Sequence, residues 1–384
     1  MSQASAGAVA LGRIAAIAGL ALLLGVAPSD YGDLHWRFVG PLRGGRTTSI
    51  AGVPGRPNEF LIGVVNGGIW RTNDAGRTWR PIFDGQPTGS IGALAIAASD
   101  PQVVYAGSGE GLQRPDLAVG DGIYRSADGG ATWTHLGLRD GQQIPAIAVD
   151  PKDPNRLFVA VLGHPYGPNP ERGVYRSTDG GAHFSRVLYE NENAGAYDVV
   201  LDPRDPNVVY ASLWAARQAP WEIGSSFEIA GSGIFKSVDG GNTWTQLTAG
   251  LPARIGRAEI APAPSDPRIV YAYADTQERG GAVYRSDDAG AHFARTDDAP
   301  EIAQRGDDLV SLAVDPRSAN VVYLTNTSFY RSEDSGKTFV PIKGAPGGDD
   351  YHTVWIDPAD PGTIALASDQ GATISVDAGR TWSS

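Results

Sequence analysis

Most of the candidate acids and arginines lie in irregular parts of the sequence, where side chains often contact a ligand. The candidate catalytic acids are Glu110, Glu171, Asp198 and Asp308. Hydrolysis of a glycosidic bond usually needs two carboxyl groups, one of which serves as the general acid. The candidate ligand-binding residues are Arg43, Arg46, Arg114, His164, Arg172, Arg217, Trp221 and Arg257. Arginine holds carboxylates by paired hydrogen bonds, so this set predicts an anionic partner, which is a peptide, a protein or a glycan.

Composition and spacing exclude several other kinds of chemistry. The 384 residues contain no Cys, which rules out disulfides, thiolate metal ligands and a cysteine nucleophile. The 6 His residues show no metal-ligand spacing, and we expect neither a metal ion nor a cofactor. No phosphate-binding glycine loop and no Gly-x-Ser-x-Gly nucleophile motif is present. The formal net charge of −12 argues against a nucleic-acid partner.

The element that positions these side chains is built around a repeated octapeptide with the pattern [ST]-x-D-x-G-x-[TH]-[WF]. It occurs seven times, and its aspartates are Asp74, Asp128, Asp179, Asp239, Asp288, Asp334 and Asp377. Asp in such a turn accepts hydrogen bonds from nearby backbone N–H groups, and the Gly that follows tolerates a positive φ. We expect the terminal Trp or Phe to fill the gap between adjacent sheets. The seven aspartates are therefore predicted to be structural.

Four short strands accompany each octapeptide. An apolar strand such as Ile144–Val149 leads to an Asp-Pro turn, and a β-branched and aromatic strand such as Val208–Ala211 follows. A third strand starts after Gly, as in Gly233–Lys236, and the fourth strand comes after the octapeptide. One unit of four strands every 43 to 60 residues, without helical periodicity, is typical of a propeller blade. The sequence predicts an all-β fold, a single propeller with seven four-stranded antiparallel blades.

The start of the chain predicts an export signal. An almost unbroken apolar run covers Ile14–Ala27, and we assign residues 1–27 to a signal peptide or an uncleaved N-terminal anchor. The alternative is that this segment is the first helix of the fold. The expected location is periplasmic or secreted, with membrane contact only through such an anchor. Residues 28–384 are assigned to the propeller, in which His35–Val39 supplies the strand missing after Trp382 and closes the ring.

A propeller has two ends, and the sequence separates them. The Asp-Pro turns and the octapeptides share one end, whereas the interblade loops and the loops between second and third strands share the other. The candidate residues fall at this second end. Asp198 and Glu259 interrupt apolar innermost strands, so we expect them to face the axial channel. Arg43 and Arg46 either reach this channel or bridge neighbouring blades, and Trp221 either stacks on a ligand or anchors its own loop.

The octapeptides resemble the Asp-box (BNR) repeats of sialidases, sortilin-type receptors and two-propeller xyloglucanases. The segments Gly40–Arg46, Gly67–Thr72 and Gly107–Glu110 also resemble exported bacterial Asp-box proteins that are described as glycosyl hydrolases or as sortilin-like. The resemblance covers nearly all of the chain after residue 27. It implies a propeller fold strongly and an activity only weakly.

Two functions follow from this resemblance. The preferred one is an exported, sortilin-like propeller that holds a peptide or polymer on its variable loops, and the alternative is a glycoside hydrolase with a carboxylate pair. The F/Y-R-I-P segment of sialidases is absent. The xyloglucanases use one catalytic Asp from each of two propellers, and Asn66 takes the place of the first in the aligned segment Val64–Gly68. Neither specific activity is therefore predicted.

Overall fold

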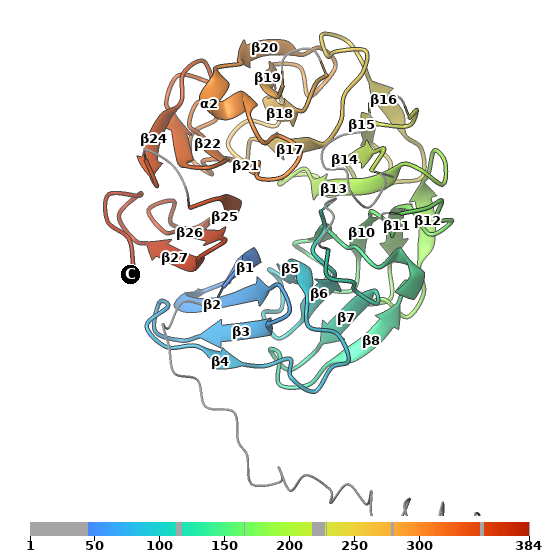
Figure 1. Cartoon of the computed structure of the whole chain (residues 1–384), viewed down its shortest axis with the longest axis vertical. Helices are drawn as coiled ribbons and strands as arrows, with labels where there is room; N and C mark the ends of the chain where they lie inside the picture. The colour runs from blue at the N-terminus through green and yellow to red at the C-terminus, as the bar shows by residue number, and fades with distance from the viewer. Residues whose placement is uncertain are drawn as a thin grey trace, which may run out of the picture. The chain divides into compact units, whose positions relative to one another are not determined.

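The computed structural model of the chain describes residues 45–112, 117–164, 166–216, 227, 229–277, 280–345 and 349–383. These residues form seven antiparallel sheets that follow one another around a ring (Figure 1). The prediction of an all-β, seven-bladed propeller is confirmed. The chain enters each sheet at its innermost strand and leaves it at its outermost strand, so the strand order is the order of the sequence.

The first three blades contain four strands each. The first has β1 (Thr47–Val53), β2 (Arg56–Val64), β3 (Gly68–Thr72) and β4 (Arg80–Pro81). The second has β5 (Ile91–Ile96), β6 (Val104–Ser108), β7 (Ile123–Ser126) and β8 (Thr134–Gly137). The third has β9 (Ala146–Val149), β10 (Leu157–Val161), β11 (Gly173–Ser177) and β12 (Ser185–Leu188).

The next three blades repeat this arrangement. The fourth has β13 (Gly195–Leu201), β14 (Val209–Trp214), β15 (Gly233–Ser237) and β16 (Thr245–Leu247). The fifth has β17 (Ala258–Pro262), β18 (Val270–Ala274), β19 (Ala282–Ser286) and β20 (Ala294–Asp297). The sixth has β21 (Leu312–Val314), β22 (Val322–Thr325), β23 (Phe329–Ser332) and β24 (Val340–Lys343).

The seventh blade shows three strands within the described residues, β25 (Tyr351–Ile356), β26 (Ile364–Ser368) and β27 (Gly371–Ser375). The backbone N–H of Ser383 donates to the carbonyl of Ile374 on β27, at a distance of 2.8 Å. The predicted closing strand, His35–Val39, lies outside the described residues, as does the predicted signal segment 1–27. Both stay predictions.

Helix is rare in the described part of the chain, as the sequence predicts. It consists of a 3₁₀ turn, η1 (Arg139–Gly141), and one short helix, α2 (Pro300–Ala303). Within these residues no helix is long and apolar enough to cross a membrane.

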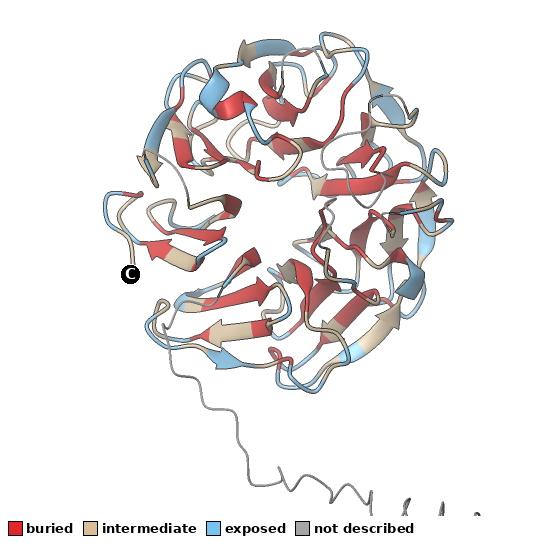
Figure 2. Ribbon diagram, in the orientation of Figure 1, coloured by how far each residue is buried: buried red, intermediate tan, exposed pale blue. Residues whose placement is uncertain are grey.

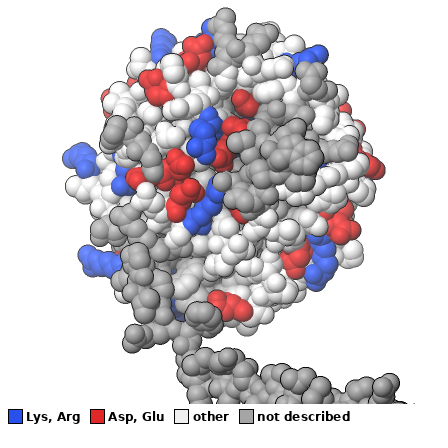
Figure 3. Space-filling view, in the orientation of Figure 1, with Lys and Arg blue, Asp and Glu red and all other residues white. Residues whose placement is uncertain are grey.

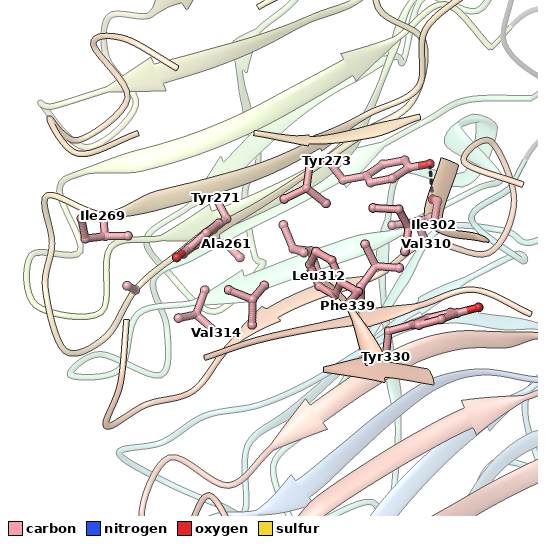
Figure 4. Close-up of a cluster of buried hydrophobic side chains, with 14 residues drawn as sticks. Ala261, Ile269, Tyr271, Tyr273, Ile302, Val310, Leu312, Val314, Tyr330 and Phe339 are labelled. Atoms are coloured by element: carbon pink, nitrogen blue, oxygen red, sulfur yellow. Dashed lines mark hydrogen bonds between the residues drawn. The ribbon is translucent and has the colours of Figure 1, made fainter. Parts of the chain in front are cut away.

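The core lies between the blades. Figure 2 shows the inner strands mostly buried and the outermost strands exposed along the rim. In the contact between the fifth and sixth blades, Tyr271 and Tyr273 pack against Leu312, Val314 and other apolar side chains (Figure 4). Seven such clusters lie between adjacent blades, and each contains the terminal aromatic residue of one octapeptide. These residues are Trp79, Trp133, Phe184, Trp244, Phe293, Phe339 and Trp382. The octapeptides therefore connect adjacent blades, as the sequence predicts.

Each octapeptide forms the same hydrogen-bonded turn. In the second blade, Ser126 Oγ donates to Asp128 Oδ1 at 2.7 Å and accepts the N–H of Gly130 at 2.7 Å. Asp128 also accepts the N–H of Thr132 at 2.8 Å and its hydroxyl at 2.6 Å. The serine is buried and the aspartate is exposed. Bonds from the Thr132 hydroxyl, the Thr132 N–H and Ser126 lower the pKa of Asp128 to about 2.

Acid should weaken these turns. The pKa values of the other six turn aspartates are also lowered to about 2. A carboxyl with a depressed pKa stabilises the fold above its unfolded pKa of about 4, and this contribution disappears as the pH falls toward 2. We expect the melting temperature to drop across this interval, and to depend less on pH in Asp128→Asn. Thermal unfolding followed by circular dichroism measures both. Asp84→Asn, which changes an exposed acid outside the turns, serves as the control, and an unchanged acid dependence in Asp128→Asn would contradict this role.

The first and last blades meet directly. Thr353 Oγ1 on β25 donates to the carbonyl of Thr48 on β1 at 2.7 Å. Beside this bond, Phe60 of the first blade packs edge-on against Trp355 of the seventh, with ring centroids 5.8 Å apart. Gly52 on β1 leaves space for the indole, because a Cβ at this position would lie 2.2 Å from Trp355 Cη2. The ring therefore closes through a tightly packed contact.

Gly52→Ala should strain this contact. Inserting a methyl group into a packed interface typically costs about 1–3 kcal/mol, since the Trp355 ring and the backbone must shift. We expect a lower midpoint of urea unfolding. Gly85→Ala is the matched control, because a Cβ there meets no atom within 4 Å. Equal midpoints for the two variants would show that the contact between the first and last blades accommodates the extra methyl group without loss of stability.

Candidate functional site

The strand order places the octapeptides and the candidate residues that the structure describes at opposite ends of the ring. β1 runs from the second end, which holds the interblade loops, to the first end, and β2 returns. Every octapeptide follows the third strand of its blade, so it lies at the first end. The loops between second and third strands and the starts of the innermost strands lie at the second end. Glu110, Arg172 and Arg257 belong to this second end.

A cavity of about 150 Å³ opens where the innermost strands start. Its walls come from every blade of the ring. The lining residues are Thr48, Gly92, Glu110, Gly111, Leu112, Pro145, Ala146, Tyr197, Asp198, Arg257, Glu259, Asp308, Ser311, His352 and Thr353. Four of these residues are acids and one is an arginine, so the cavity has an acidic wall.

Irregular pairing brings several of these side chains to the cavity. The register of the innermost strand shifts across Thr48, Gly92, Tyr197 and His352, so each is left out of regular pairing with the next strand. All four line the cavity. A bulge bends a strand and redirects a side chain, and bulges often occur beside functional sites. The cavity wall is thus built by the same irregularity in four blades.

Two carboxyl groups from neighbouring blades meet in this cavity. Asp198 on β13 is 7% exposed, and the side chain of Glu259 on β17 is 15% exposed. Asp198 Oδ2 accepts the N–H of Ile260 at 2.9 Å, which ties the two strands together. Both interrupt apolar strands, and both face the channel as the sequence predicts.

Arg257 supports Glu259 from behind. Arg257 is 1% exposed, and its guanidinium lies 3.1 Å from Glu259 Oε1. The same guanidinium donates to the carbonyl of Gly306 at 3.0 Å, and also to the carbonyl of Val310 and the hydroxyl of Tyr197. It lies over the Tyr197 ring, 4.3 Å from the centroid. These contacts hold the arginine and Glu259 in one position.

Burial raises the pKa of both carboxyls. For Glu259, the negative charge of Asp198 raises the pKa further, and Arg257 offsets only part of this. For Asp198, hydrogen bonds from the N–H groups of Ile260 and Val199 oppose the effect of burial. The pair therefore holds a proton near neutral pH, and Glu259 has the stronger tendency to carry it. One protonated and one ionised carboxyl are what acid–base catalysis requires.

A second charged cluster lies beside the pair. Arg46 Nε is 3.4 Å from Asp369 Oδ1 and 4.0 Å from Glu110 Oε2, and Arg46 Nη2 is 3.6 Å from Asp308 Oδ1. The Nε2 atom of His352 lies 2.7 Å from Asp369 Oδ1. Figure 3 shows acidic and basic side chains next to one another near the centre of the face in view. Arg46 thus connects acids of several blades, which is the bridging arrangement considered from the sequence.

Other candidates lie elsewhere. Arg172 is fully buried between β10 and β11, where it donates to the carbonyls of Leu162, His164 and Gly167. Burial lowers the pKa of His164, and Glu171 is next to Arg172 in the same loop. This cluster supports its own loop and does not line the cavity. Arg43, Arg114, Arg217 and Trp221 lie outside the described residues, and their roles stay predictions.

Three residues of the site were not candidates for it. Glu259 was recognised as a channel residue but not as a catalytic acid, although its position in an apolar strand is the same kind of signal as that of Asp198. Tyr197 precedes Asp198, and only the bulge turns it inward. Asp369 lies in the turn between β26 and β27, and nothing in its sequence neighbourhood indicates that it contacts His352. In the described parts of the chain, no group of three or more His, Asp and Glu side chains is arranged to hold a metal ion.

Known proteins similar to this chain fall into more than one functional class. No protein-family model matches the chain. A xyloglucanase of Hypocrea jecorina is 27% identical over 369 residues, which are 84% of this chain and 42% of that enzyme. The dispase autolysis-inducing protein of Streptomyces mobaraensis is 27% identical over 300 residues, 70% of this chain and 77% of that protein. The chain spans less than half the length of this xyloglucanase.

Solved structures support the fold. The GH74 xyloglucanase from Xanthomonas campestris superposes with a TM-score of 0.63 and 21% identity, over 90% of this chain and 54% of that one. Among the curated relatives, the xyloglucanase supports the alternative prediction, a protein similar to glycoside hydrolases, better than the sortilin-like one.

Proposed function

We propose that this propeller is a glycoside hydrolase that binds a glycan at the mouth of its channel and cleaves it with Glu259 and Asp198. The observation that carries this proposal is the pair of carboxyls in one cavity, where burial raises the pKa of both. The similarity to xyloglucanases supports the same class of substrate.

The environments of the two carboxyls suggest their roles. Glu259 carries the proton and acts as the general acid, which protonates the glycosidic oxygen as the bond to the leaving sugar breaks. Asp198 is the ionised partner, because backbone N–H groups stabilise its carboxylate. It activates water or attacks the anomeric carbon. Arg257 positions Glu259 and does not itself take part.

The cavity favours a neutral glycan over the anionic ligand expected from the arginines. Glu110, Asp198, Glu259 and Asp308 line it, against two nearby arginines, of which Arg257 donates to Glu259 and Arg46 lies 4.0 Å from Glu110 and 3.6 Å from Asp308. Carboxylates repel an anion at short range, whereas sugar hydroxyls donate hydrogen bonds to them. A binding site for an anion would have to be formed by the variable loops, including residues outside those described.

Binding without turnover is the second candidate function. It is favoured by Asn66, which stands where the resembling xyloglucanases have a catalytic Asp. Asn66 lies in the turn between β2 and β3, and its N–H donates to Ser90 Oγ at 2.9 Å. An amide cannot act as a general base, so hydrolysis by this chain depends on a different pair of acids from that of the two-propeller enzymes.

A glycan panel tests the proposal. The purified full chain is incubated with xyloglucan, xylan, mannan, β-glucan and an anionic polysaccharide, and new reducing ends are measured together with binding by calorimetry. Release of reducing ends from a neutral glycan supports the hydrolase. Binding without release supports the second candidate, and failure to bind any neutral glycan contradicts both.

A further inference from the structure

Tyr197 is a buried residue of the channel to which the proposed acid pair gives no role. It lies at the bulge of β13, it is 8% exposed, and it lines the same cavity as Asp198 and Glu259. Its ring is held on two sides. Trp214 packs edge-on against it, with ring centroids 5.7 Å apart, and the guanidinium of Arg257 lies over its face. These contacts fix the position of the Tyr197 hydroxyl.

The hydroxyl of Tyr197 and the carboxyl of Glu259 contact the same nitrogen atom. Arg257 Nη2 donates to the Tyr197 oxygen and also to Glu259 Oε1, which lies 3.1 Å away. Two oxygens that bond to one nitrogen lie close to each other. A guanidinium N–H only donates, so the Tyr197 oxygen is the acceptor in its bond with Arg257. The hydrogen of the hydroxyl is therefore left for another acceptor.

Glu259 is the acceptor for this hydrogen. Burial and the charge of Asp198 raise the pKa of Glu259, whereas Arg257 and a hydrogen bond from Tyr197 lower it. Asp308, which precedes β21, lines the same cavity, and its charge acts on Arg257. Burial raises the pKa of Tyr197, so the hydroxyl keeps its proton at neutral pH. Tyr197 is thus a donor to the ionised form of Glu259.

We propose that Tyr197 is a positioning residue of this site, which orients Glu259 and stabilises its carboxylate as the acid gives its proton to the glycosidic oxygen. This inference rests on the proposed function, because it assumes that Glu259 is the general acid. The proton leaves Glu259 while the bond to the leaving sugar breaks, and Tyr197 keeps its own proton throughout. A donor to the charged form of the acid acts more strongly in the transition state than in the substrate complex, so it raises the rate of the chemical step.

Tyr197→Phe removes this donor and keeps the ring. We expect the pKa of Glu259 to rise by about one pH unit, the value of one hydrogen bond to a charged group. Turnover should fall about two- to tenfold, because the carboxylate is only partly formed in the transition state. The alkaline limb of the rate profile should move to higher pH, while the affinity for the glycan changes little. Initial rates of reducing-end release across pH measure this, with whichever of xyloglucan, xylan, mannan and β-glucan the wild type cleaves.

A matched control comes from another buried tyrosine. Tyr105 is also buried, and its hydroxyl donates to the carbonyl of Pro154 at 2.8 Å, in a different pair of blades. Tyr105→Phe loses one hydrogen bond of similar length without touching Glu259. It should leave the alkaline limb in its wild-type position.

A second variant changes the donor in the opposite direction. Tyr197→3-fluorotyrosine, introduced at this position alone, has a more acidic hydroxyl and donates a stronger hydrogen bond to the carboxylate. It should lower the pKa of Glu259 and move the alkaline limb to lower pH, because a bond to the charged form favours that form. Shifts of opposite sign in the two variants identify the hydrogen bond, since a loss of packing would not follow the acidity of the phenol. This variant keeps the hydroxyl, so it also tests the inference if Tyr197→Phe does not fold.

The pKa of Glu259 is measured without any glycan. In the full chain labelled with ¹³C-glutamate, the carboxyl signal that disappears in Glu259→Gln belongs to Glu259. Its titration in the wild type and in the two variants at position 197 gives the three pKa values directly. We expect them to increase from the fluorotyrosine variant through the wild type to Tyr197→Phe.

The outcomes distinguish this inference from the proposed function. An unchanged pKa of Glu259 in Tyr197→Phe, at equal melting temperature, overturns the inference and leaves the hydrolase standing. Slower turnover with an alkaline limb that stays in place gives Tyr197 a purely structural role and also overturns it. If the wild type releases no reducing ends, the proposed function fails and the inference falls with it, even where the carboxyl titrates as expected.

Discussion

Replacing Arg257 by alanine should destabilise the propeller by about 3–5 kcal/mol, because several buried hydrogen-bond acceptors lose their donor, at about 1–3 kcal/mol each. Arg257 is 1% exposed, and its guanidinium connects two blades, because it donates to Glu259 of the fifth blade and to the carbonyls of Gly306 and Val310 before the sixth. Its removal leaves these acceptors buried without a donor. The free energy of urea unfolding measures the loss.

An exposed arginine provides the control. The side chain of Arg268 is 74% exposed and lies 2.7 Å from Asp266. Surface ion pairs contribute little to stability, so Arg268→Ala should keep the wild-type midpoint. Arg257→Lys keeps the charge but cannot reach all of these acceptors at once, and we expect an intermediate loss. A wild-type midpoint for Arg257→Ala would show that the fold does not depend on this network.

The sequence was sufficient for the architecture because the determinants of a blade are local. Each octapeptide contains its own donor and acceptor groups, so the turn of Ser126 and Asp128 is closed by residues no more than four positions away. Asp198 and Glu259 were also placed correctly at the channel, since a charge in an apolar innermost strand has only one wet surface to face.

The partners of the site residues could not be predicted, since they come from distant parts of the chain. Arg257 was expected to bind a ligand at the second end of the ring. The structure places it at that end, but its guanidinium is bonded to Tyr197, 60 positions earlier, and to Val310, 53 positions later. Whether it also contacts a ligand stays a prediction. Sequence periodicity does not reveal such contacts, and it does not reveal a bulge of one residue either.

Glu259→Gln should reduce glycan turnover at least about a hundredfold, because it removes the proton that the general acid delivers to the leaving group. Asp198→Asn should cause a loss of the same order by removing the ionised partner. Glycan affinity should change much less, since both substitutions keep the size and polarity of the side chains. Initial rates of reducing-end release, with the dissociation constant from calorimetry, separate the two effects.

The stability of Glu259→Gln shows whether its loss of turnover comes from the missing proton or from unfolding of the variant. The pKa of Glu259 is about 4.3 in the unfolded chain and is raised in the folded protein. Its contribution to stability is therefore complete below about pH 4.3 and is lost as the pH rises through the folded pKa, because the folded protein must then bury a charge. Glutamine stays neutral, so the variant should be at least as stable as the wild type above neutral pH. Wild-type turnover should also fall on that alkaline side as Glu259 ionises. An active Glu259→Gln, or a wild-type rate that keeps rising with pH, would show that Glu259 does not supply the proton.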